Sequence, residues 1–339
     1  MKSFEFLDQF GNIDETYITE AYELKNMKVR KVSRKFLIYL AAALAVCLLT
    51  VTVYAAMNYF GISDMKKDTL HPLPQEAETY IQQQEVTGEA QDWSCYLVET
   101  LFDSTHFMVT VGISGGDKYI VAPTYCGPDD SVAEIGLSGS ETLGEYAAKQ
   151  GKKLLLVGAD INDRDKLGIA VASQMYRNHT DCEMTILVEG DYTIDASKGT
   201  CQVYALEGEA ARENGGDDVQ RIYLPFTINK APTTAERVFK PDNPDAIPGL
   251  RVGEATIAET PLGISVRIPE TVTDQEAFYG IMKVEFDEIT YGEGGSLPQE
   301  DGSYCFQVSM GKGTVTDTLT VHYYDWDKQL VGTITFHAQ

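Results

Sequence analysis

Hydrophobic and polar residues follow three different patterns along the chain. In residues 13–24 the apolar residues recur every three or four positions. From Phe36 through Ser63 the chain contains no charged residue. From Trp93 onward, short segments with alternating apolar and polar residues are separated by turns rich in Gly, Pro and Asp. These patterns predict, in chain order, an amphipathic helix, a membrane-spanning helix and a long β-rich region.

The uncharged run is centred on residues 36–57, FLIYLAAALAVCLLTVTVYAAM. A helix of this length spans ~33 Å, which matches a hydrocarbon core of ~30 Å. We therefore predict one transmembrane helix at residues 36–57. One alternative is a buried core helix, although soluble cores rarely contain so long an uncharged run. The other is a signal peptide with Val53-Tyr54-Ala55 at its cleavage site; the long N-terminal region that precedes the segment argues against it.

Charged residues on the two sides of this segment predict its orientation. Residues 25–35 contain basic side chains and no acidic ones, whereas Asp64, Lys66, Lys67 and Asp68 cancel each other on the far side. Basic flanks stay on the cytoplasmic side, so the prediction is a single-pass protein of the cell membrane with a cytoplasmic N-terminus and extracellular C-terminal domains. The topology-determining residues are Lys25, Lys28, Arg30, Lys31, Arg34 and Lys35.

Net charge is divided at the same place. The chain has 27 Lys and Arg, 51 Asp and Glu, and a formal net charge of −24. Residues 1–35 are nearly neutral, so almost all of the negative charge belongs to the predicted exterior, which argues against direct nucleic-acid binding. We attribute this charge to solubility. Calcium binding is the alternative, but Asp160-Ile-Asn-Asp163-Arg-Asp165 lacks the glycine and terminal glutamate of an EF-hand, and we predict no metal.

The N-terminal tail is predicted to form one short amphipathic helix, whose start is indicated by the capping-box-like pair of Asn12 and Glu15. An isolated helix of ~14 residues is marginally stable in water, so its apolar stripe needs a partner. We favour a protein groove over the inner membrane surface, because Asp14, Glu20 and Glu23 are repelled by anionic lipids. A tail that only sets topology is the third alternative. The partner-binding stripe is Ile13, Tyr17, Ile18, Ala21 and Leu24.

The predicted exterior begins with a stalk and a first β-sandwich. Residues 58–90 are polar and rich in glutamine, which predicts a stalk with a short helix near residues 75–84. Residues 91–230 contain eight strand-like segments and fit a β-sandwich. One inserted helix is predicted at Ser140–Gln150, with Ser140 as its N-cap and Gly151 after its end.

A linker and a second β-sandwich follow. Residues 231–249 contain several of the twelve prolines and are the predicted linker. Residues 250–339 contain six further strand-like segments. The predicted fold class is therefore mainly β, with two tandem immunoglobulin-like β-sandwich domains outside the membrane, one transmembrane helix and a short cytoplasmic amphipathic helix.

Motifs of catalysis are missing or fit a structural role better. Gly112-Ile-Ser114-Gly-Gly116 matches G-x-S-x-G, but the next element is predicted to be a strand instead of the required helix, so we interpret it as a hairpin turn. The five histidines are dispersed. We predict no enzyme, no catalytic residue and no cofactor. Tyr323-Tyr324-Asp-Trp326 provides stacking surfaces for a sugar, although such aromatic residues more commonly divide between core and edge.

Cysteine usage does not indicate a disulfide framework. Cys47 lies in the predicted membrane helix, and the exterior has an odd number of cysteines without close spacing. Buried, unpaired thiols are therefore favoured. The alternative is a disulfide between Cys182 and Cys201, which bracket a hairpin-like segment. The exterior cysteines are Cys95, Cys126, Cys182, Cys201 and Cys305.

The layout of the chain resembles a group of bacterial single-pass membrane proteins. The resemblance is carried by the short segment NIDETYITEA, the basic patch, one membrane helix ending in VYAA, and a β-rich exterior. Many members are encoded beside extracytoplasmic-function sigma factors and are described as anti-sigma-like or as domains of unknown function. The resemblance implies a cytoplasmic element that reports to a sigma factor and an immunoglobulin-like sensing exterior. The chain lacks the His-x3-Cys-x2-Cys zinc signature of the commoner anti-sigma domain.

Together these observations predict a membrane-anchored regulatory or sensor protein that is anti-sigma-factor-like. Its expected partners are the membrane, a cytoplasmic sigma factor or other regulator, and an extracellular ligand whose identity the sequence does not specify. The alternative is a cell-surface binding or adhesion module for a carbohydrate or protein, with a tail that serves only insertion.

Overall fold

The computed structural model separates the chain into two compact parts, Met1–Asn58 and Tyr59–Gln339. The predicted cytoplasmic stripe, basic cluster and transmembrane helix all fall before residue 58 and lie outside the described residues. Within the described part of the chain, no helix is long and apolar enough to cross a membrane. The structure describes residues 59–69, 72–162, 169, 172–192, 197–208, 219–291, 294–299 and 301–339.

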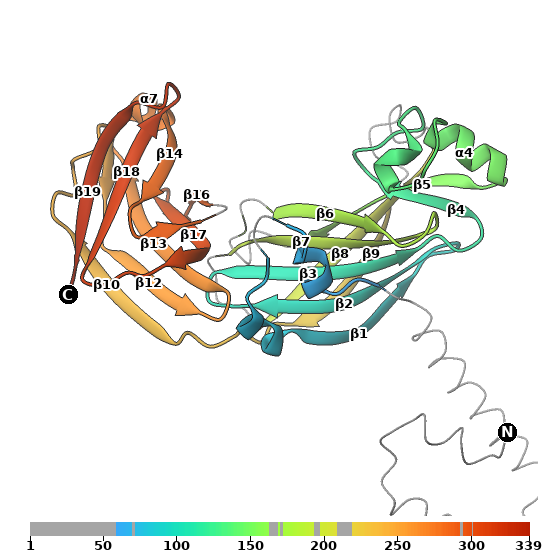
Figure 1. Ribbon diagram of the computed structural model, residues 1–339, viewed down its shortest axis with the longest axis horizontal. Coiled ribbons are helices and arrows are strands. Elements are labelled where there is room, and N and C mark those ends of the chain that lie inside the picture. Colours follow the sequence, from blue (N-terminus) through green and yellow to red (C-terminus); the bar gives the residue numbers. More distant parts are fainter. Residues whose placement is uncertain are drawn as a thin grey trace, which may run out of the picture. The chain divides into compact units, whose positions relative to one another are not determined.

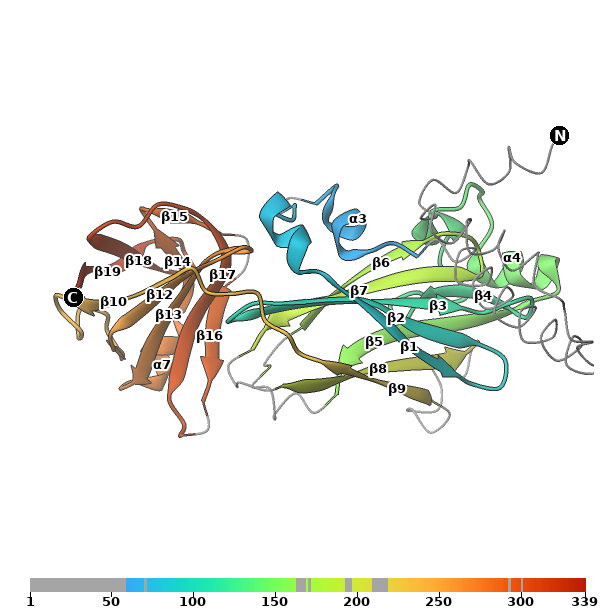
Figure 2. The ribbon, with the colours of Figure 1, turned by 90° about the horizontal axis from the view of Figure 1, so that it is seen from below.

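The fold is mainly β, as the alternating pattern predicts. Residues 82–228 form a first β-region of two sheets (Figures 1 and 2). Among the described residues the strand orders are β1-β2-β3-β7-β6 and β4-β5-β8-β9. The first sheet contains β1 (Gln82–Glu89), β2 (Ser94–Phe102), β3 (His106–Ser114), β6 (Ala172–Asn178) and β7 (Glu183–Asp191). The second contains β4 (Tyr119–Pro123), β5 (Lys153–Ile161), β8 (Lys198–Glu207) and β9 (Gln220–Thr227).

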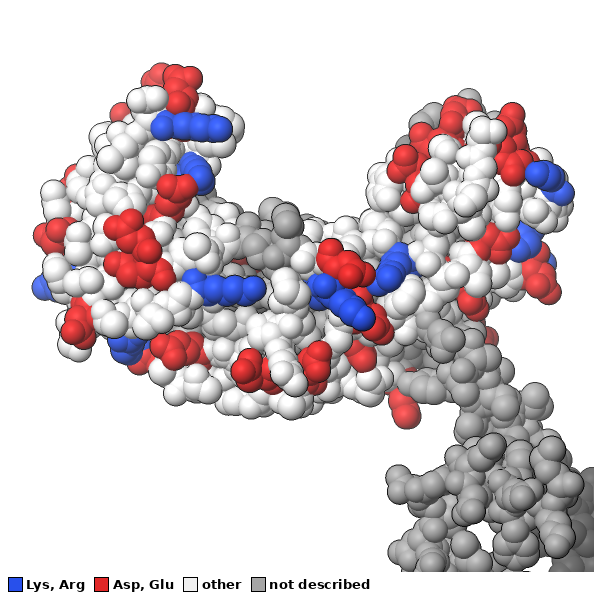
Figure 3. All heavy atoms as spheres, in the orientation of Figure 1, with Lys and Arg blue, Asp and Glu red and all other residues white. Residues whose placement is uncertain are grey.

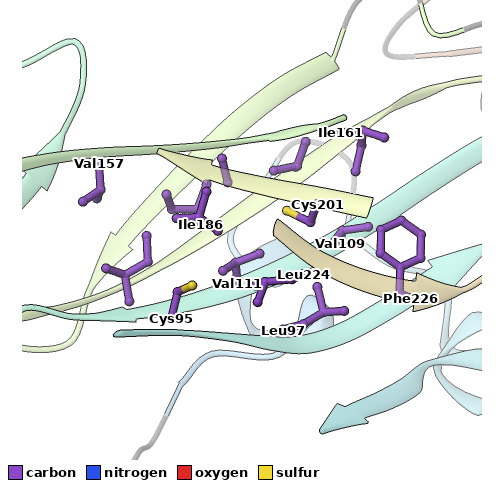
Figure 4. Close-up of a cluster of buried hydrophobic side chains, with 14 of the residues drawn as sticks. Cys95, Leu97, Val109, Val111, Val157, Ile161, Ile186, Cys201, Leu224 and Phe226 are labelled. Atoms are coloured by element: carbon purple, nitrogen blue, oxygen red, sulfur yellow. The ribbon is translucent and has the colours of Figure 1, made fainter. Parts of the chain in front are cut away.

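Apolar side chains from both sheets form the core of the first β-region. Figure 4 shows the buried side chains of Leu97, Val111, Val157, Ile186 and Leu224 gathered between the strands. Each strand contributes alternate residues to this core, because successive side chains of a strand point to opposite faces. Full burial of one such side chain stabilises the fold by about 1.5–3 kcal/mol.

The inserted helix is confirmed, and the sheet topology explains its presence. Strands β4 and β5 are parallel, and parallel neighbours need a crossover connection, which here contains η3 (Val132–Ile135) and α4 (Leu143–Gln150). The N-cap of α4 is Thr142 instead of the predicted Ser140. Thr142 and Glu145 form a reciprocal capping box, and Gly151 ends the helix with a φ of 68°.

Residues 235–339 form the second β-region. Its sheet follows the order β14-β18-β19-β10-β12-β13-β17-β15 among the described residues, with β11 beside β13 and β16 beside β17. Among the described residues, the short helices α3 (Ile62–Lys66) and η2 (Gln75–Tyr80) precede the first β-region, and α7 (Gln275–Tyr279) lies in the second. The strands are β10 (Ala235–Pro241), β11 (Leu250–Val252), β12 (Ala255–Thr260), β13 (Gly263–Val272), β14 (Ile281–Phe286), β15 (Ile289–Thr290), β16 (Gly294–Pro298), β17 (Tyr304–Gly313), β18 (Thr318–Asp325) and β19 (Leu330–Ala338).

Two predicted connections are instead part of the folded structure. The stalk prediction is wrong for the described residues of 58–90, because β1 pairs with β2 and Ile62 and Ala77 are fully buried, although the short helix expected near residues 75–84 is present as η2. The linker prediction is wrong for residues 235–241, because β10 pairs with both β12 and β19. Strand β1 appears polar in sequence because it is an edge strand whose residues alternate between half-buried and exposed positions.

The remaining local predictions concern Ser114 and the cysteines. Ser114 ends β3 and is followed by a turn and β4, so the segment is a strand-to-strand connection and not a nucleophile elbow. Cys182 and Cys201 are both free thiols, as are the other described cysteines. Cys201 is buried in the core beside β9, whereas Cys182 is only partly buried, in the turn between β6 and β7.

Candidate functional site

The segment that directly follows the predicted membrane helix is bound to the outer face of the β1-β2-β3-β7-β6 sheet. The Phe60 ring stacks on His179, with ring centroids 4.1 Å apart, and the Arg177 guanidinium lies 4.2 Å from the Phe60 centroid. The Phe60 N–H donates to Thr185 Oγ1 at 3.1 Å. Burial and the nearby Arg177 charge lower the pKa of His179, which favours the neutral ring where it stacks on Phe60.

Two glycines permit this close approach. A Cβ on Gly112 of β3 would lie 2.5 Å from the Tyr59 ring, and a Cβ on Gly61 would lie 2.5 Å from Glu99 Oε2. The Ile62 N–H donates to that same carboxylate at 2.6 Å. The backbone of the segment is therefore held against β2 and β3 at positions where a larger residue would force it away.

Helix α3 ends in a buried ion pair. Lys66 is only 5% exposed, and its Nζ lies 2.9 Å and 3.1 Å from the two carboxylate oxygens of Glu189 on β7. Figure 2 shows α3 over the β1-β2-β3-β7-β6 sheet, where it contacts β2 and β3. Burial opposes ionisation of Glu189, but His106 and the Lys66 charge outweigh it and lower its pKa to about 2.

His106 on β3 extends the ion pair into a cluster of four charges. Its Nδ1 lies 2.7 Å from Asp191 Oδ1, and its Nε2 lies 3.9 Å from Glu189 Oε2. Burial alone would lower the pKa of His106, but these two carboxylates raise it to about 10. His106 is therefore an imidazolium at neutral pH, and the two cations and two anions balance. Such balance is the condition under which buried charges are tolerated.

Side chains of the second β-region complete this cluster. Ser309 Oγ of β17 lies 3.0 Å from His106 Nδ1, and Gln307 Nε2 donates to the Thr105 carbonyl at 3.1 Å. Thr260 Oγ1 donates to Asp103 Oδ2 at 2.8 Å. We call the residues that join α3 and the two β-regions the junction: Ile62, Met65, Lys66, Asp103, His106, Glu189, Asp191, Thr260, Leu262, Gln307, Ser309 and Met310.

The combination of Ser309, His106 and Asp191 is not a catalytic triad. In a triad, the nucleophile and the carboxylate contact different nitrogens of the histidine. Here both approach Nδ1, while Nε2 has no hydrogen-bond partner among the described residues and faces Glu189. His106 and Ser309 are also buried, at 3% and 4% exposure. The arrangement is suited to holding segments together and not to attacking a substrate.

A cleft of about 710 Å³ lies on the second β-region beside the edge strand β14. Its charged groups are already paired, Lys283 with Glu285 and His322 with Asp287. The Tyr291 hydroxyl donates to the Val284 carbonyl of β14, which protects part of this edge from strand addition. The lining residues are Lys283, Val284, Glu285, Phe286, Asp287, Ile289, Thr290, Tyr291, Gly294, His322 and Tyr324.

Exposed apolar side chains gather at the start of β14 and at the β18–β19 turn. Trp326 is 70% exposed, and its Nε1–H donates to the Tyr279 carbonyl at 3.0 Å. Met282 and Leu330 are also exposed. Tyr323, in contrast, is fully buried, so the expected division of the Tyr323–Trp326 aromatic residues between core and edge is confirmed.

The sequence-predicted site residues and the junction do not overlap. The cytoplasmic stripe (Ile13, Tyr17, Ile18, Ala21 and Leu24) and the basic cluster lie outside the described residues, as do residues 163–165 of the rejected calcium segment. Over the ranges that the structure describes, no group of three or more metal-ligating side chains is found. The sequence signal that was available for the junction is a charged residue within an apolar strand, Glu189 in TILVEGD. This signal does not by itself identify the junction, because the partners of Glu189 are distant in sequence.

Charge is dispersed over the visible surface. Figure 3 shows Asp and Glu side chains on both β-regions with Lys and Arg side chains interspersed. On the face shown, no continuous basic surface is present among the described residues.

Comparison with known proteins does not identify a family. No known protein family and no curated protein matches the chain. Among solved structures, the chain is similar to "the conserved domain protein from Bacillus anthracis", with 12% sequence identity and a TM-score of 0.43. The match covers 79% of this chain and 93% of that protein. This likeness is too distant to support an argument about function.

Proposed function

We propose that the protein is a single-pass membrane sensor, anti-sigma-factor-like, that links an extracellular β-rich region to a cytoplasmic transcription regulator. The uncharged segment at residues 36–57 and its basic N-terminal flank support the topology. The attachment of residues 59–66 to the first β-region supports coupling, and it is the observation that carries the proposal.

Coupling requires an ordered connection between the β-regions and the membrane helix. A flexible stalk would allow the exterior to change without moving the helix. Here Phe60, Ile62 and Lys66 bind three different side chains of one sheet within a single short segment. A change in that sheet, or in what contacts it, is therefore transmitted to residues that lie directly beside the predicted membrane helix.

At the cytoplasmic end, the proposed contact is the apolar stripe of the N-terminal helix. Ile13, Tyr17 and Leu24 recur at helical spacing and present an apolar face to a protein groove. A sigma factor is the regulator that the resemblance implies. The stripe is the part of the tail that would carry this contact.

Co-purification tests the cytoplasmic half of the proposal. The full chain is extracted from its membrane, and the sigma factor encoded nearby is expected to co-purify with it. Tyr17→Asp together with Ile18→Asp should remove the sigma factor, whereas Lys2→Gln, outside the stripe, should not. Equal recovery of the sigma factor with the double variant would show that the stripe is not the contact.

A flexible insertion tests the coupling. Six Gly and Ser residues inserted between Asn58 and Tyr59 preserve the anchor and the β-regions but disconnect them mechanically. Transcripts controlled by the sigma factor are expected to stop responding to envelope conditions. The control is the same insertion at Gly302, in an exposed turn with a φ of 82°. A normal response with the first insertion would refute the coupling.

A second candidate function is a surface binding or adhesion module. It is favoured by the cleft beside β14 and by the exposed Trp326 near it. Deletion of residues 3–24 separates the two functions, because it should alter transcripts only in a sensor. Loss of binding to envelope polysaccharide in Trp326→Ala, with transcripts unchanged by the deletion, would favour the adhesion module.

A further inference from the structure

We infer that the second β-region is a cover for the membrane-proximal helix α3, and that α3 is released when the second β-region moves away from the junction. The inference deepens the proposed function by identifying the regulated element, and it rests on that function only for its consequence in the cell. The contact itself lies within the compact part Tyr59–Gln339.

The first half of the cover is apolar. Leu262, in the turn between β12 and β13, is buried in the same cluster as Ile62 and Met65 of α3. Met310 of β17 packs against this cluster as well. Removal of the second β-region would take Leu262 and Met310 away from this cluster and expose part of it to water, and a helix of five residues has little stability of its own.

The second half of the cover is polar. A continuous series of contacts runs from Ser309 of β17 to His106, from His106 to Glu189, and from Glu189 to Lys66 of α3. The Lys66–Glu189 ion pair is strong only while water is excluded, because solvent-exposed ion pairs contribute little. The second β-region helps to exclude this water through Gln307 and Ser309, which are buried against β3.

A local backbone feature supports a specific fit at the junction. Met310 has a φ of 54°, which is uncommon for a residue other than glycine. It lies where β17 changes register against β13, between the pairs of Ile264 and Val266. Such conformations persist where surrounding packing holds them in place. The second β-region therefore holds Met310 in an unfavourable backbone conformation at the position where it packs against the apolar cluster that contains Ile62 and Met65.

The contacts of the membrane-proximal segment fall into two groups. Phe60 makes its ring contacts with Arg177 and His179 of the first β-region, although its side chain also packs against the apolar cluster that contains Leu262. Lys66 belongs to the series that ends at Ser309. Movement of the second β-region should therefore loosen the Lys66 end of α3 and leave the Phe60 end attached.

Hydrogen–deuterium exchange of the full chain in nanodiscs tests this inference directly. In the variant Leu262→Ala/Ser309→Ala, backbone amides of residues 62–69 should exchange about tenfold faster than in the unmodified chain, because the α3 contacts are weakened. The control variant Leu330→Ala/Ser303→Ala makes the same two types of substitution elsewhere in the second β-region. It should leave exchange in residues 62–69 unchanged.

The reciprocal experiment separates coupling from general loosening. Coupling between two sites is mutual, so Lys66→Met should increase exchange in β17, residues 304–313, whereas Arg177→Gln should not.

If Leu262→Ala unfolds the second β-region, Thr260→Val/Ser309→Ala removes only hydroxyl groups and provides the same test. Faster exchange in β17 with unchanged exchange in residues 62–69 would overturn the inference.

The outcomes also distinguish this inference from the proposed function. If Leu262→Ala/Ser309→Ala speeds exchange in residues 62–69 but leaves transcripts unchanged, the second β-region covers α3 and the sensor function is refuted. If the Gly/Ser insertion abolishes the transcript response to envelope conditions but exchange in residues 62–69 does not depend on the second β-region, the sensor function stands and the inference about α3 is refuted.

Discussion

We expect the stability of the second β-region to fall as the pH rises from about 4.5 to about 7, because a carboxyl group is buried in it. Glu270 of β13 is 1% exposed, and its hydrogen bond comes from Ser296 Oγ at 2.6 Å. The Tyr323 hydroxyl is also buried, but it has no hydrogen-bond partner among the described residues and therefore does not stabilise the Glu270 carboxylate. Burial raises the pKa of Glu270 from 4.5 to about 7, although the Ser296 hydrogen bond lowers it in part.

The sign and size of the effect follow from this pKa. Because the folded pKa exceeds the unfolded pKa, the folded protein binds more protons between these two values, and stability decreases with rising pH. Below the unfolded pKa the group is neutral in both states, and the full stability is present. Above the folded pKa the loss is complete. At 1.36 kcal/mol per unit, a change from 4.5 to about 7 corresponds to about 3 kcal/mol.

Urea unfolding at a series of pH values measures this effect. Trp326 fluorescence reports on the second β-region when Trp93, the other tryptophan of the chain, is replaced by Phe. In this background the unfolding free energy should decline between pH 4.5 and 7, and Glu270→Gln should remove most of the decline. The exposed Glu236→Gln is the matched control and should retain it. An undiminished decline in Glu270→Gln would refute the reasoning.

Three further substitutions test other parts of the structure, each by its unfolding free energy in urea. Lys66→Met should destabilise the protein by about 3 kcal/mol, because it removes one of the two cations that balance the buried carboxylates of Glu189 and Asp191; a loss below 1 kcal/mol would contradict the buried ion pair. Gly112→Ala should cost about 1–3 kcal/mol through overlap with Tyr59, whereas Gly295→Ala, which has open space around its Cβ position, should be neutral. Thr142→Ala should cost about 1 kcal/mol by removing the α4 capping box, and Thr142→Ser should restore most of it.

Local sequence patterns are sufficient to predict most strands and the inserted helix. Strands β2, β3 and β7 contain apolar residues at alternating or continuous positions, and turn residues mark their ends. Helix α4 was found from its cap region and from Gly151, since helix ends depend on residues only a few positions apart. The predicted N-cap, Ser140, lies two positions before the observed one, Thr142, because Ser and Thr are both good N-caps.

Edge elements were harder to recognise. Strand β1 has no fully buried residue, and β10 contains Pro241 and lies in a proline-rich stretch. Both segments are strands because of their hydrogen-bonded partners: β1 pairs with β2, and β10 pairs with β12 and β19. These partners lie outside the segments themselves, so a short window of sequence does not reveal the pairing. Composition alone therefore assigned both to connections.

The candidate junction depends on contacts that no short-range pattern encodes. Lys66 and Glu189 are 123 positions apart, and Ser309 and His106 are 203 positions apart. In isolation each of these residues resembles an ordinary surface residue, and only the folded chain removes them from water and pairs them. The hydrophobic pattern is a property of neighbours in the chain, so it was enough to predict the β-rich class, which the structure confirms, and a membrane segment, which stays a prediction. Charge pairing in a buried site is a property of neighbours in space, so the attachment of α3 became visible only in the tertiary structure.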